Sequence, residues 1–380
     1  MRSHHHFPEI DRLRGLAILM VIYDHLAVPP FGLLAPYIHP MLRETWTGVD
    51  LFFAISGFVV FLSLQRSNSA LEFYKRRFWR IAPLALLCSA VPTAVVWMMG
   101  GFSEMTSMEQ VGQDFLAIVT LRFNYAFAYA TKGALLLSPY WSLCVEEHFY
   151  LLLPLFVLFL RNRTQRLLVG LAVILASPLA LRPWVYEWTQ PPHQLPYFRA
   201  ATHCRLDGLL VGVLLAEYWR ASKGKGRNLR WKFLAGNALS LLAIAALVLI
   251  PNLMKGVDGL NWGNSATAAI SAGLVWLASR DAGYVFELPG LRRLLSVVGQ
   301  HSYALYLLHM PAYYLAVGIF RANLQALQPS EVALIVLTYG GLLASLAYAC
   351  RRWIELPLME YGRGFSLAKS LKKISRALRV

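Results

Sequence analysis

The sequence predicts an all-α, polytopic membrane protein with about ten transmembrane helices. Hydrophobic residues make up 57% of the chain and charged residues only 15%, whereas soluble domains contain about 45–50% and about 25% of these two classes. The apolar residues gather in runs that are long enough to cross the hydrocarbon core of a bilayer. The basic residues lie in short clusters between these runs, which is typical of helices oriented by cytoplasmic Lys and Arg. A bundle embedded in lipid carries this much apolar surface on its outside.

The apolar runs define the expected helices in order. Two of them, 167–181 and 206–219, are short and need flanking residues to span the membrane. A further apolar segment, 115–131, carries Arg122 and Asn124, and we expect it to be an interfacial or re-entrant element on the outer face. The expected spans are 15–34, 47–64, 81–99, 140–160, 167–181, 206–219, 233–251, 262–279, 296–320 and 332–350.

The distribution of charge orients this bundle. With the N-terminus inside, the expected cytoplasmic segments hold 28 of the 36 Lys and Arg residues, and all other segments together hold 8. Such a bias predicts that both termini are cytoplasmic. The formal charge of +16 does not indicate nucleic-acid binding, because the basic residues are dispersed between apolar runs instead of forming one soluble face.

The domain organisation is simple. We expect a transmembrane core over residues 1–360 and a basic amphipathic cytoplasmic tail over 361–380, either bound to the anionic inner leaflet or disordered. No soluble domain is expected at either end, and His4–His6 are set aside as a tag remnant or a native run. The four cysteines include no C-x-x-C pair, so neither a disulfide framework nor a metal site is expected.

Ionisable residues within the expected spans are costly and mark candidate functional positions. Arg14 and His25 are eleven residues apart, which places them on nearly the same helix face, within about 20°, and roughly 16 Å apart along the axis. His25 then lies near the middle of the bilayer, in line with an arginine at the cytoplasmic edge. A buried neutral imidazole can act as a general base. Its position alone also allows a histidine that is hydrogen-bonded within the bundle and performs no chemistry.

This arrangement suits a ligand with an anionic head and a long, thin, reactive arm, and coenzyme A thioesters are such molecules. The phosphates would lie near Arg14 and the cluster Lys75, Arg76, Arg77 and Arg80, because guanidinium groups bind two phosphate oxygens at once. The same cluster also fits plain positive-inside orientation. Both interpretations can hold together.

Carboxylates enter the expected helices from the outer side. Glu146 and Glu147 are adjacent and point about 100° apart on a helix, so at most one faces the same pocket as His25. Asp50 and one of these glutamates can line an outward-facing cavity for sugar hydroxyls. Structural pairing, for instance with Arg205 or Arg122, is the alternative.

Two further polar positions complete this set. Asp207 begins the sixth expected span beside Arg205. His309 lies near the middle of the ninth, where it forms either a second polar wall of the cavity or a hydrogen-bonded core histidine.

Many of the residues singled out above belong to six motifs that resemble those of the acyltransferase 3 family of integral membrane acyltransferases. The motifs occur in the order expected for that family and extend over nearly the whole chain, with His148 where glutamine is usual. They are Ile10–Ala17 followed by His25 in an R-x10-H spacing, Gly48–Phe58 (GVDLFFAISGF), Arg77–Pro83 (RFWRIAP), Trp141–Tyr150 (WSLCVEEHFY), Ser302–His309 (SYALYLLH) and Arg352–Pro357 (RWIELP).

The resemblance implies an O-acyltransferase of the bacterial inner membrane with a ten-helix core. It implies transfer of an acyl group, most often acetyl from acetyl-CoA on the cytoplasmic side, to a carbohydrate hydroxyl. The acceptors in such a family are cell-envelope or exported polysaccharides, peptidoglycan and small glycosylated molecules. The partners are therefore acyl-CoA, a carbohydrate and the lipid bilayer, with no nucleic acid. Homo-oligomers and partners from envelope biosynthesis are left open, as are the acceptor and the acyl chain length.

The candidate residues fall into three groups. The catalytic candidates are His25, Asp50, Glu146 and Glu147, and the donor-binding candidates are Arg14, Lys75, Arg76, Arg77 and Arg80. The substrate-binding candidates are Asp11, Ser56, Ser142, Tyr150, Arg205, Asp207, Tyr306 and His309.

Our mechanistic hypothesis makes His25 the base that removes the proton of the sugar hydroxyl, while a carboxylate orients the imidazole or the acceptor. An acyl-histidine relay is a second version. A transporter or flippase of a glycan precursor, without acyl transfer, is the alternative function.

Overall fold

The structure, a computed structural model, describes residues 6–28, 32–99, 108–129, 135–189, 194–222, 230–320 and 327–364. Within these ranges the chain forms helices and contains no strand, which confirms the all-α prediction. Two π-helical segments, Ser177–Leu181 and Arg351–Glu355, continue α7 and α15. The α-helices are α1 Pro8–Ala27, α2 Gly48–Arg66, α3 Ala70–Met98, α4 Met108–Val119, α5 Phe123–Tyr129, α6 Tyr140–Phe159, α7 Arg163–Ala176, α8 Arg182–Trp188, α9 Gln194–Ala200, α10 Thr202–Ala221, α11 Arg230–Leu253, α12 Gly256–Ala278, α13 Pro289–Gln300, α14 Ser302–Ile319, α15 Pro329–Cys350 and α16 Leu356–Gly364.

The length and composition of the helices support a multi-pass membrane protein. Among the described residues, 6 helical segments are long and apolar enough to cross a bilayer: Gly48–Arg66, Ala70–Met98, Tyr140–Phe159, Arg163–Trp188, Leu234–Leu253 and Pro329–Gly362. α1 and α10 are of similar length but carry several Asp, Glu and Arg side chains each. The expected number of ten spans and the cytoplasmic location of both termini stay predictions.

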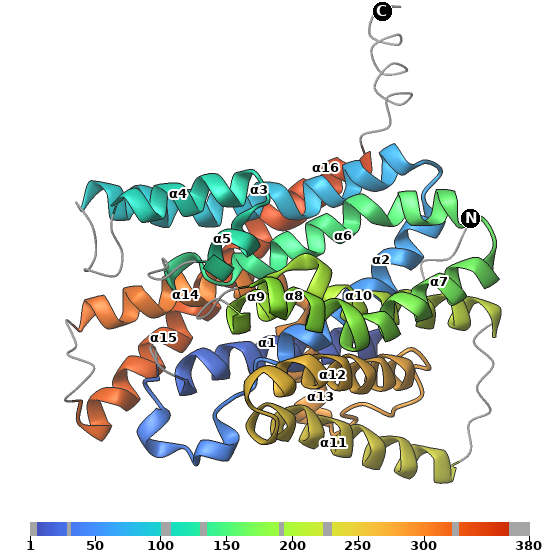
Figure 1. Cartoon of the computed structure of the whole chain (residues 1–380). Helices are drawn as coiled ribbons and strands as arrows, with labels where there is room; N and C mark the ends of the chain where they lie inside the picture. The colour runs from blue at the N-terminus through green and yellow to red at the C-terminus, as the bar shows by residue number, and fades with distance from the viewer. Residues whose placement is uncertain are drawn as a thin grey trace, which may run out of the picture.

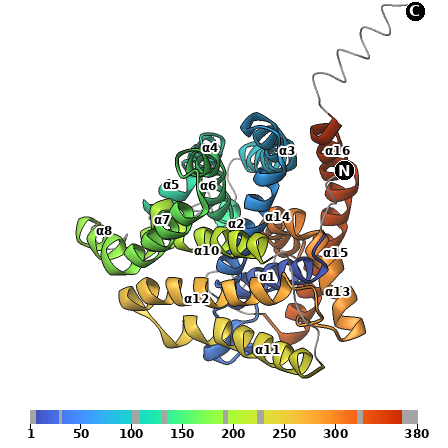
Figure 2. The same ribbon diagram turned by 90° about the vertical axis from the view of Figure 1, so that its right-hand side faces the viewer.

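The charged helices α1 and α10 lie in the middle of the bundle. Figures 1 and 2 show α1, α2 and α10 surrounded by the other helices, with α3, α4 and α6 along one side and α11 and α12 along the opposite side. α2 packs along α10, and α1 packs against α13 and α2. This arrangement keeps most of the charged groups of α1 and α10 away from lipid and next to one another, where they can pair.

Glycines permit a close contact between α2 and α10. A Cβ atom on Gly57 of α2 would lie 1.9 Å from the carbonyl oxygen of Leu209 on α10, and one on Gly212 would lie 2.2 Å from that of Ala54. Only glycine allows two helix backbones to approach this closely. The contact fixes α2, which carries several of the candidate site residues.

Two of the expected spans were wrong in extent. The first helix was expected over 15–34 but ends at Ala27, where Val28 is extended, because the following Pro29 and Pro30 disfavour a continued helix. The run 296–320 is not one helix. His301 interrupts it (φ −97°, ψ 2°), so that α13 packs against α1 and α14 begins at Ser302.

The segment 115–131 is not one spanning helix. It includes the end of α4 and all of α5, and Leu121 between them has a positive φ of 56°. Its expected location at the outer interface stays a prediction. Of the expected tail 361–380, residues 365–380 lie outside the described residues.

Candidate active site

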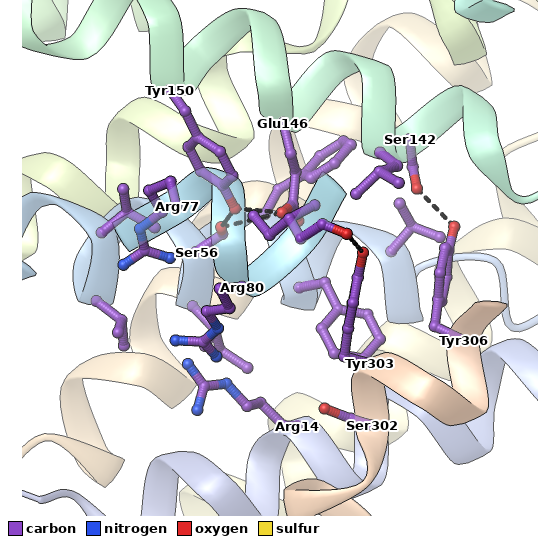
Figure 3. A pocket seen from close by; sticks show the side chains of 18 residues that line it. Arg14, Ser56, Arg77, Arg80, Ser142, Glu146, Tyr150, Ser302, Tyr303 and Tyr306 are labelled. Atoms are coloured by element: carbon purple, nitrogen blue, oxygen red, sulfur yellow. Dashed lines mark hydrogen bonds between the residues drawn. The ribbon is translucent and has the colours of Figure 1, made fainter. Parts of the chain in front are cut away.

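Five helices surround a cavity of about 110 Å³, here called the arginine cavity. α1, α2, α3, α6 and α14 each contribute side chains to it, and Figure 3 shows the guanidinium groups of Arg14, Arg77 and Arg80 gathered at one end. The other polar residues that line it are Ser56, Ser142, Glu146, Tyr150, Ser302, Tyr303 and Tyr306. The cavity therefore combines a cationic end with a wall of hydroxyl groups.

Glu146 is the glutamate that faces this cavity. Its carboxylate accepts hydrogen bonds from the Tyr150 hydroxyl and from Ser56 Oγ, the latter at 3.3 Å, and Ser56 Oγ and the Tyr150 hydroxyl are 2.5 Å apart. Glu147 points elsewhere, and its Oε1 is buried without a hydrogen-bond partner among the described residues. At most one of the pair was expected to face the pocket of His25; neither glutamate lines the cavity that contains His25, and only Glu146 lines the arginine cavity.

Two of the three arginines of the cavity are held in different ways. Arg14 Nη1 donates to Asp11 Oδ1 at 2.9 Å, so Asp11 positions an arginine and is absent from the lining of the cavity. The guanidinium of Arg77 lies over the rings of Tyr150, at 5.5 Å, and Phe73, at 5.8 Å. Such stacking holds a cation in place without neutralising it.

A second cavity, of about 550 Å³ and here called the histidine cavity, contains His25. The Nδ1 atom of His25 lies 2.9 Å from the carbonyl oxygen of Val21. Because a carbonyl oxygen can only accept, Nδ1 carries the hydrogen and Nε2 the lone pair, which is the form of imidazole that acts as a base. The main chain of α1 thus orients the imidazole, where a carboxylate had been one expectation.

The histidine cavity is both charged and aromatic. Charged side chains from five parts of the chain surround it together with two tryptophans, and the Arg199 guanidinium stacks over the Trp46 ring at 5.4 Å. These lining residues are Asp24, Glu44, Trp46, Trp141, Arg199, Arg205 and Lys255. Such a surface offers donors, acceptors and flat apolar rings, which suits a polar ligand with apolar faces.

The two cavities meet at Val49 and Tyr306, which line both. The Tyr306 hydroxyl is 2.5 Å from Ser142 Oγ and donates to the carbonyl oxygen of Pro139 at 3.0 Å. Arg14 and His25 therefore line two adjoining cavities, and the side chain of Tyr306 stands where they meet.

Asp50 and Asp207 lie in buried ion pairs and line neither of the two cavities, as in the alternative of structural pairing; a role in catalysis or substrate binding stays a prediction. Asp50 Oδ1 lies 2.6 Å from Arg205 Nη2, and Asp207 Oδ2 lies 2.6 Å from Arg182 Nη2. The Arg182 side chain is completely buried. A buried charge requires such a partner because desolvation is costly.

The remaining candidates divide between the cavity walls and their surroundings. Lys75 lines neither cavity, and Arg76 forms an ion pair with Glu72. His309 is fully buried behind His25. Trp46 and Arg199 were missed from the sequence, although Arg199 stands out as a cation close to the start of an expected span.

The fold and the two cavities define a class: a multi-pass helical membrane protein with a buried polar site. The family model described as an acyltransferase domain matches residues 7–350. The chain belongs to this acyltransferase family, which confirms the resemblance seen in its motifs.

Several curated proteins are similar over nearly the whole chain. O-acetyltransferase OatA of Staphylococcus aureus (strain NCTC 8325 / PS 47) is 26% identical over 95% of this chain and 58% of its own length. The putative peptidoglycan O-acetyltransferase YrhL of Bacillus subtilis (strain 168) is 26% identical over 96% of this chain and 57% of its own. Peptidoglycan O-acetyltransferase OatA of Listeria monocytogenes (serovar 1/2a, strain ATCC BAA-679 / EGD-e) is 24% identical over 95% and 57%. The chain thus spans somewhat more than half the length of these relatives. No solved structure matches it.

Proposed function

We propose that this protein is an O-acyltransferase that moves an acyl group, acetyl above all, from acyl-CoA to a hydroxyl of a cell-envelope or exported carbohydrate. One observation carries the proposal: a cavity with three arginines adjoins a cavity that contains His25, whose Nδ1 lies within hydrogen-bond distance of a main-chain carbonyl oxygen, and the two cavities share only Val49 and Tyr306. A donor and an acceptor can each occupy their own cavity and meet at this point. Membership of the family and the names of the relatives support acyl transfer.

The donor occupies the arginine cavity in this proposal. Arg14, Arg77 and Arg80 bind the phosphates, and the pantetheine arm carries the thioester past the Ser56 and Glu146 wall toward Tyr306. The excess of Lys and Arg in the expected cytoplasmic segments supports entry of this donor from the cytoplasm. The protein then lies in the inner membrane with both termini in the cytoplasm.

The acceptor occupies the histidine cavity. Trp46 and Trp141 provide flat apolar surfaces, and Arg199, Asp24 and Glu44 provide hydrogen-bonding groups. Sugars combine apolar C–H faces with hydroxyl groups, so this lining matches a carbohydrate. Two of the relatives are named for peptidoglycan O-acetylation, which makes a glycan of the cell envelope the leading acceptor.

The chemistry follows from the orientation of His25. Its Nε2 takes the proton of the acceptor hydroxyl as that oxygen attacks the thioester carbonyl carbon. The C–O bond forms, the C–S bond breaks, and the thiolate of CoA leaves and is reprotonated from the imidazolium. A positioned base contributes about 10²–10⁴-fold to such a step. In the relay version Nε2 itself attacks the thioester carbonyl and the CoA thiolate leaves; the acceptor hydroxyl then attacks the acylated imidazole, the C–N bond breaks, and the hydroxyl proton passes through solvent to the thiolate.

The test measures transfer of labelled acetyl from acetyl-CoA to glycan in proteoliposomes. His25→Gln should lower the rate by about 10²–10⁴-fold. His301→Gln is the matched control, because its Nδ1 makes the same bond to the carbonyl oxygen four residues earlier, at 2.8 Å, and it lines neither cavity. Retained activity in His25→Gln would exclude both versions of the mechanism. A transporter or flippase would consume no acetyl-CoA at all.

A further inference from the structure

A second basic pocket adjoins the arginine cavity. It has a volume of about 430 Å³, and its charged lining residues are all arginines: Arg66, Arg76, Arg77 and Arg80. Val59, Arg77 and Arg80 line both this pocket and the arginine cavity. The two spaces therefore form one basic region with two compartments.

The arginines of this pocket differ in how they are paired. Arg76 forms an ion pair with Glu72, and Arg77 is stacked on aromatic rings. Arg66 and Arg80 make no hydrogen bond or ion pair with any residue that the structure describes. Among the described residues, no carboxylate lines the pocket. Like charges that face one space repel one another, and an anion with several oxygens would relieve that repulsion and satisfy the planar donors.

We propose that this pocket binds a phosphomonoester of the donor, separately from the diphosphate, and that Arg66 is the residue that recognises it. The inference rests on the proposed function, because it concerns the same donor. Coenzyme A carries a diphosphate and, on its ribose, a 3′-phosphomonoester. Arg77 and Arg80, which belong to both compartments, face the diphosphate, and Arg66 faces the phosphomonoester.

The position of Arg66 fits this role. It is the last residue of α2, and Ser63 one turn earlier lines the same pocket. Met359 of α16 and Val59 form its apolar wall. A phosphomonoester carries about −1.5 to −2 charges at pH 7 and three acceptor oxygens. It therefore offers more negative charge and more acceptors than a single arginine can satisfy. The same Arg66 would also fit simple orientation in the membrane, but orientation alone cannot distinguish donors with and without the 3′-phosphate.

The experiment compares acetyl-CoA with 3′-dephospho-acetyl-CoA in proteoliposomes. Wild type should prefer acetyl-CoA by about tenfold or more in kcat/KM, since a charge-assisted contact is lost without the phosphate. Arg66→Gln should remove most of this preference by raising KM for acetyl-CoA, with little change for the dephospho donor. Arg163→Gln, an exposed arginine with no partner among the described residues, should keep the full preference.

A competition measurement needs no variant and covers the case in which Arg66→Gln fails to fold. Adenosine 3′,5′-bisphosphate should inhibit wild-type transfer at concentrations about tenfold lower than adenosine 5′-monophosphate. Equal use of both donors, or equal inhibition by both nucleotides, would overturn the inference while leaving the acyltransferase proposal intact. Use of neither donor would instead overturn the proposed function.

Discussion

The ring of His309 stands edge-on to the ring of His25, with their centroids 4.9 Å apart and their planes at 71°. His309 Nδ1 donates to the carbonyl oxygen of Tyr306 at 2.7 Å, just as His25 Nδ1 donates to that of Val21. Two imidazoles in the same protonation pattern are thus packed together at the border of the two cavities. His309 lines neither cavity, so we interpret it as a residue that positions His25.

Removal of the His309 ring should impair catalysis without weakening donor binding. His309→Ala leaves a space behind His25, and a displacement of about 1 Å at a reacting group can cost about 10²-fold in rate. We expect kcat for acetyl transfer to fall by roughly 10–10²-fold, with KM for acetyl-CoA nearly unchanged. Steady-state kinetics in proteoliposomes measure both.

The conservative variant His309→Phe separates packing from chemistry. It keeps a ring behind His25 but removes both nitrogens, so a positioning role predicts that much of the rate returns. If His309→Phe is as slow as His309→Ala, the buried Nε2 of His309 takes part in proton transfer and the positioning interpretation fails.

Loss of the Tyr306 hydroxyl should increase the hydrolysis of acetyl-CoA that occurs without transfer to an acceptor. In Tyr306→Phe the bonds to Ser142 and to the carbonyl oxygen of Pro139 are absent, at a cost of about 1 kcal/mol. An energy of this size changes roughly fivefold the population of conformations in which the Tyr306 side chain no longer separates the two cavities. Hydrolysis of acetyl-CoA without acceptor should rise by that factor as water passes between the cavities.

Tyr303→Phe provides the control for Tyr306. Its hydroxyl donates to the carbonyl oxygen of Ile81 at 2.7 Å, and it lines the arginine cavity but not the histidine cavity. Hydrolysis in this variant should match wild type. An equal increase in both tyrosine variants would show that general loosening, and not the junction, causes the leak.

The sequence predicted the helices better than their contacts. Apolar runs identify helices because an apolar segment in lipid must satisfy its backbone hydrogen bonds internally, wherever it lies in the bundle. The break at His301 was missed because 296–320 was treated as one apolar run despite Gly299, Gln300, His301 and Ser302 within it, and the interruption is favoured by the packing of α13 on α1. The end of the first helix before Pro29 could have been predicted from the sequence alone, because the residue before a proline disfavours the helical conformation.

The candidate site shows the same difference: positions along one helix were predicted, but contacts between helices were not. Helical spacing placed Arg14 and His25 on one face, and both line cavities in the structure. The roles of Asp50 and Asp207 depend on partners 155 and 25 residues away, Arg205 and Arg182. Spacing within a helix contains no information about such partners. The sequence therefore could not distinguish a carboxylate in an ion pair from a carboxylate that binds a ligand.

The Asp50–Arg205 pair should contribute to stability more than to the chemistry. Both side chains are only 2% exposed, and removal of one partner of a buried pair costs about 3–5 kcal/mol because the other charge is left uncompensated. Asp50→Ala should therefore lower the thermal unfolding temperature in detergent and the yield of folded protein. Asp50→Asn combined with Arg205→Met should lose less than the two single changes together. Normal stability of Asp50→Ala with abolished transfer would return Asp50 to the catalytic residues.

The contact between α2 and α10 should be sensitive even to the addition of one methyl group. In Gly57→Ala the new methyl group would lie 1.9 Å from the carbonyl oxygen of Leu209, and since both partners are backbone, the helices must separate. Overpacking of this kind costs about 1–3 kcal/mol. The shift also moves Ser56, the neighbour of Gly57, away from Tyr150, so acetyl-CoA binding should weaken together with thermal stability.

Gly273→Ala is the matched control for that substitution. Gly273 lies inside α12, and a Cβ atom there would meet nothing within 4 Å. Because alanine is favoured over glycine in a helix interior by about 1 kcal/mol, this variant should unfold at the same temperature as wild type or slightly above it, with unchanged KM for acetyl-CoA. Thermal unfolding and donor kinetics on the two variants therefore separate close packing from helix propensity. Equal behaviour of the two would mean that α2 and α10 do not touch as closely as the glycines indicate.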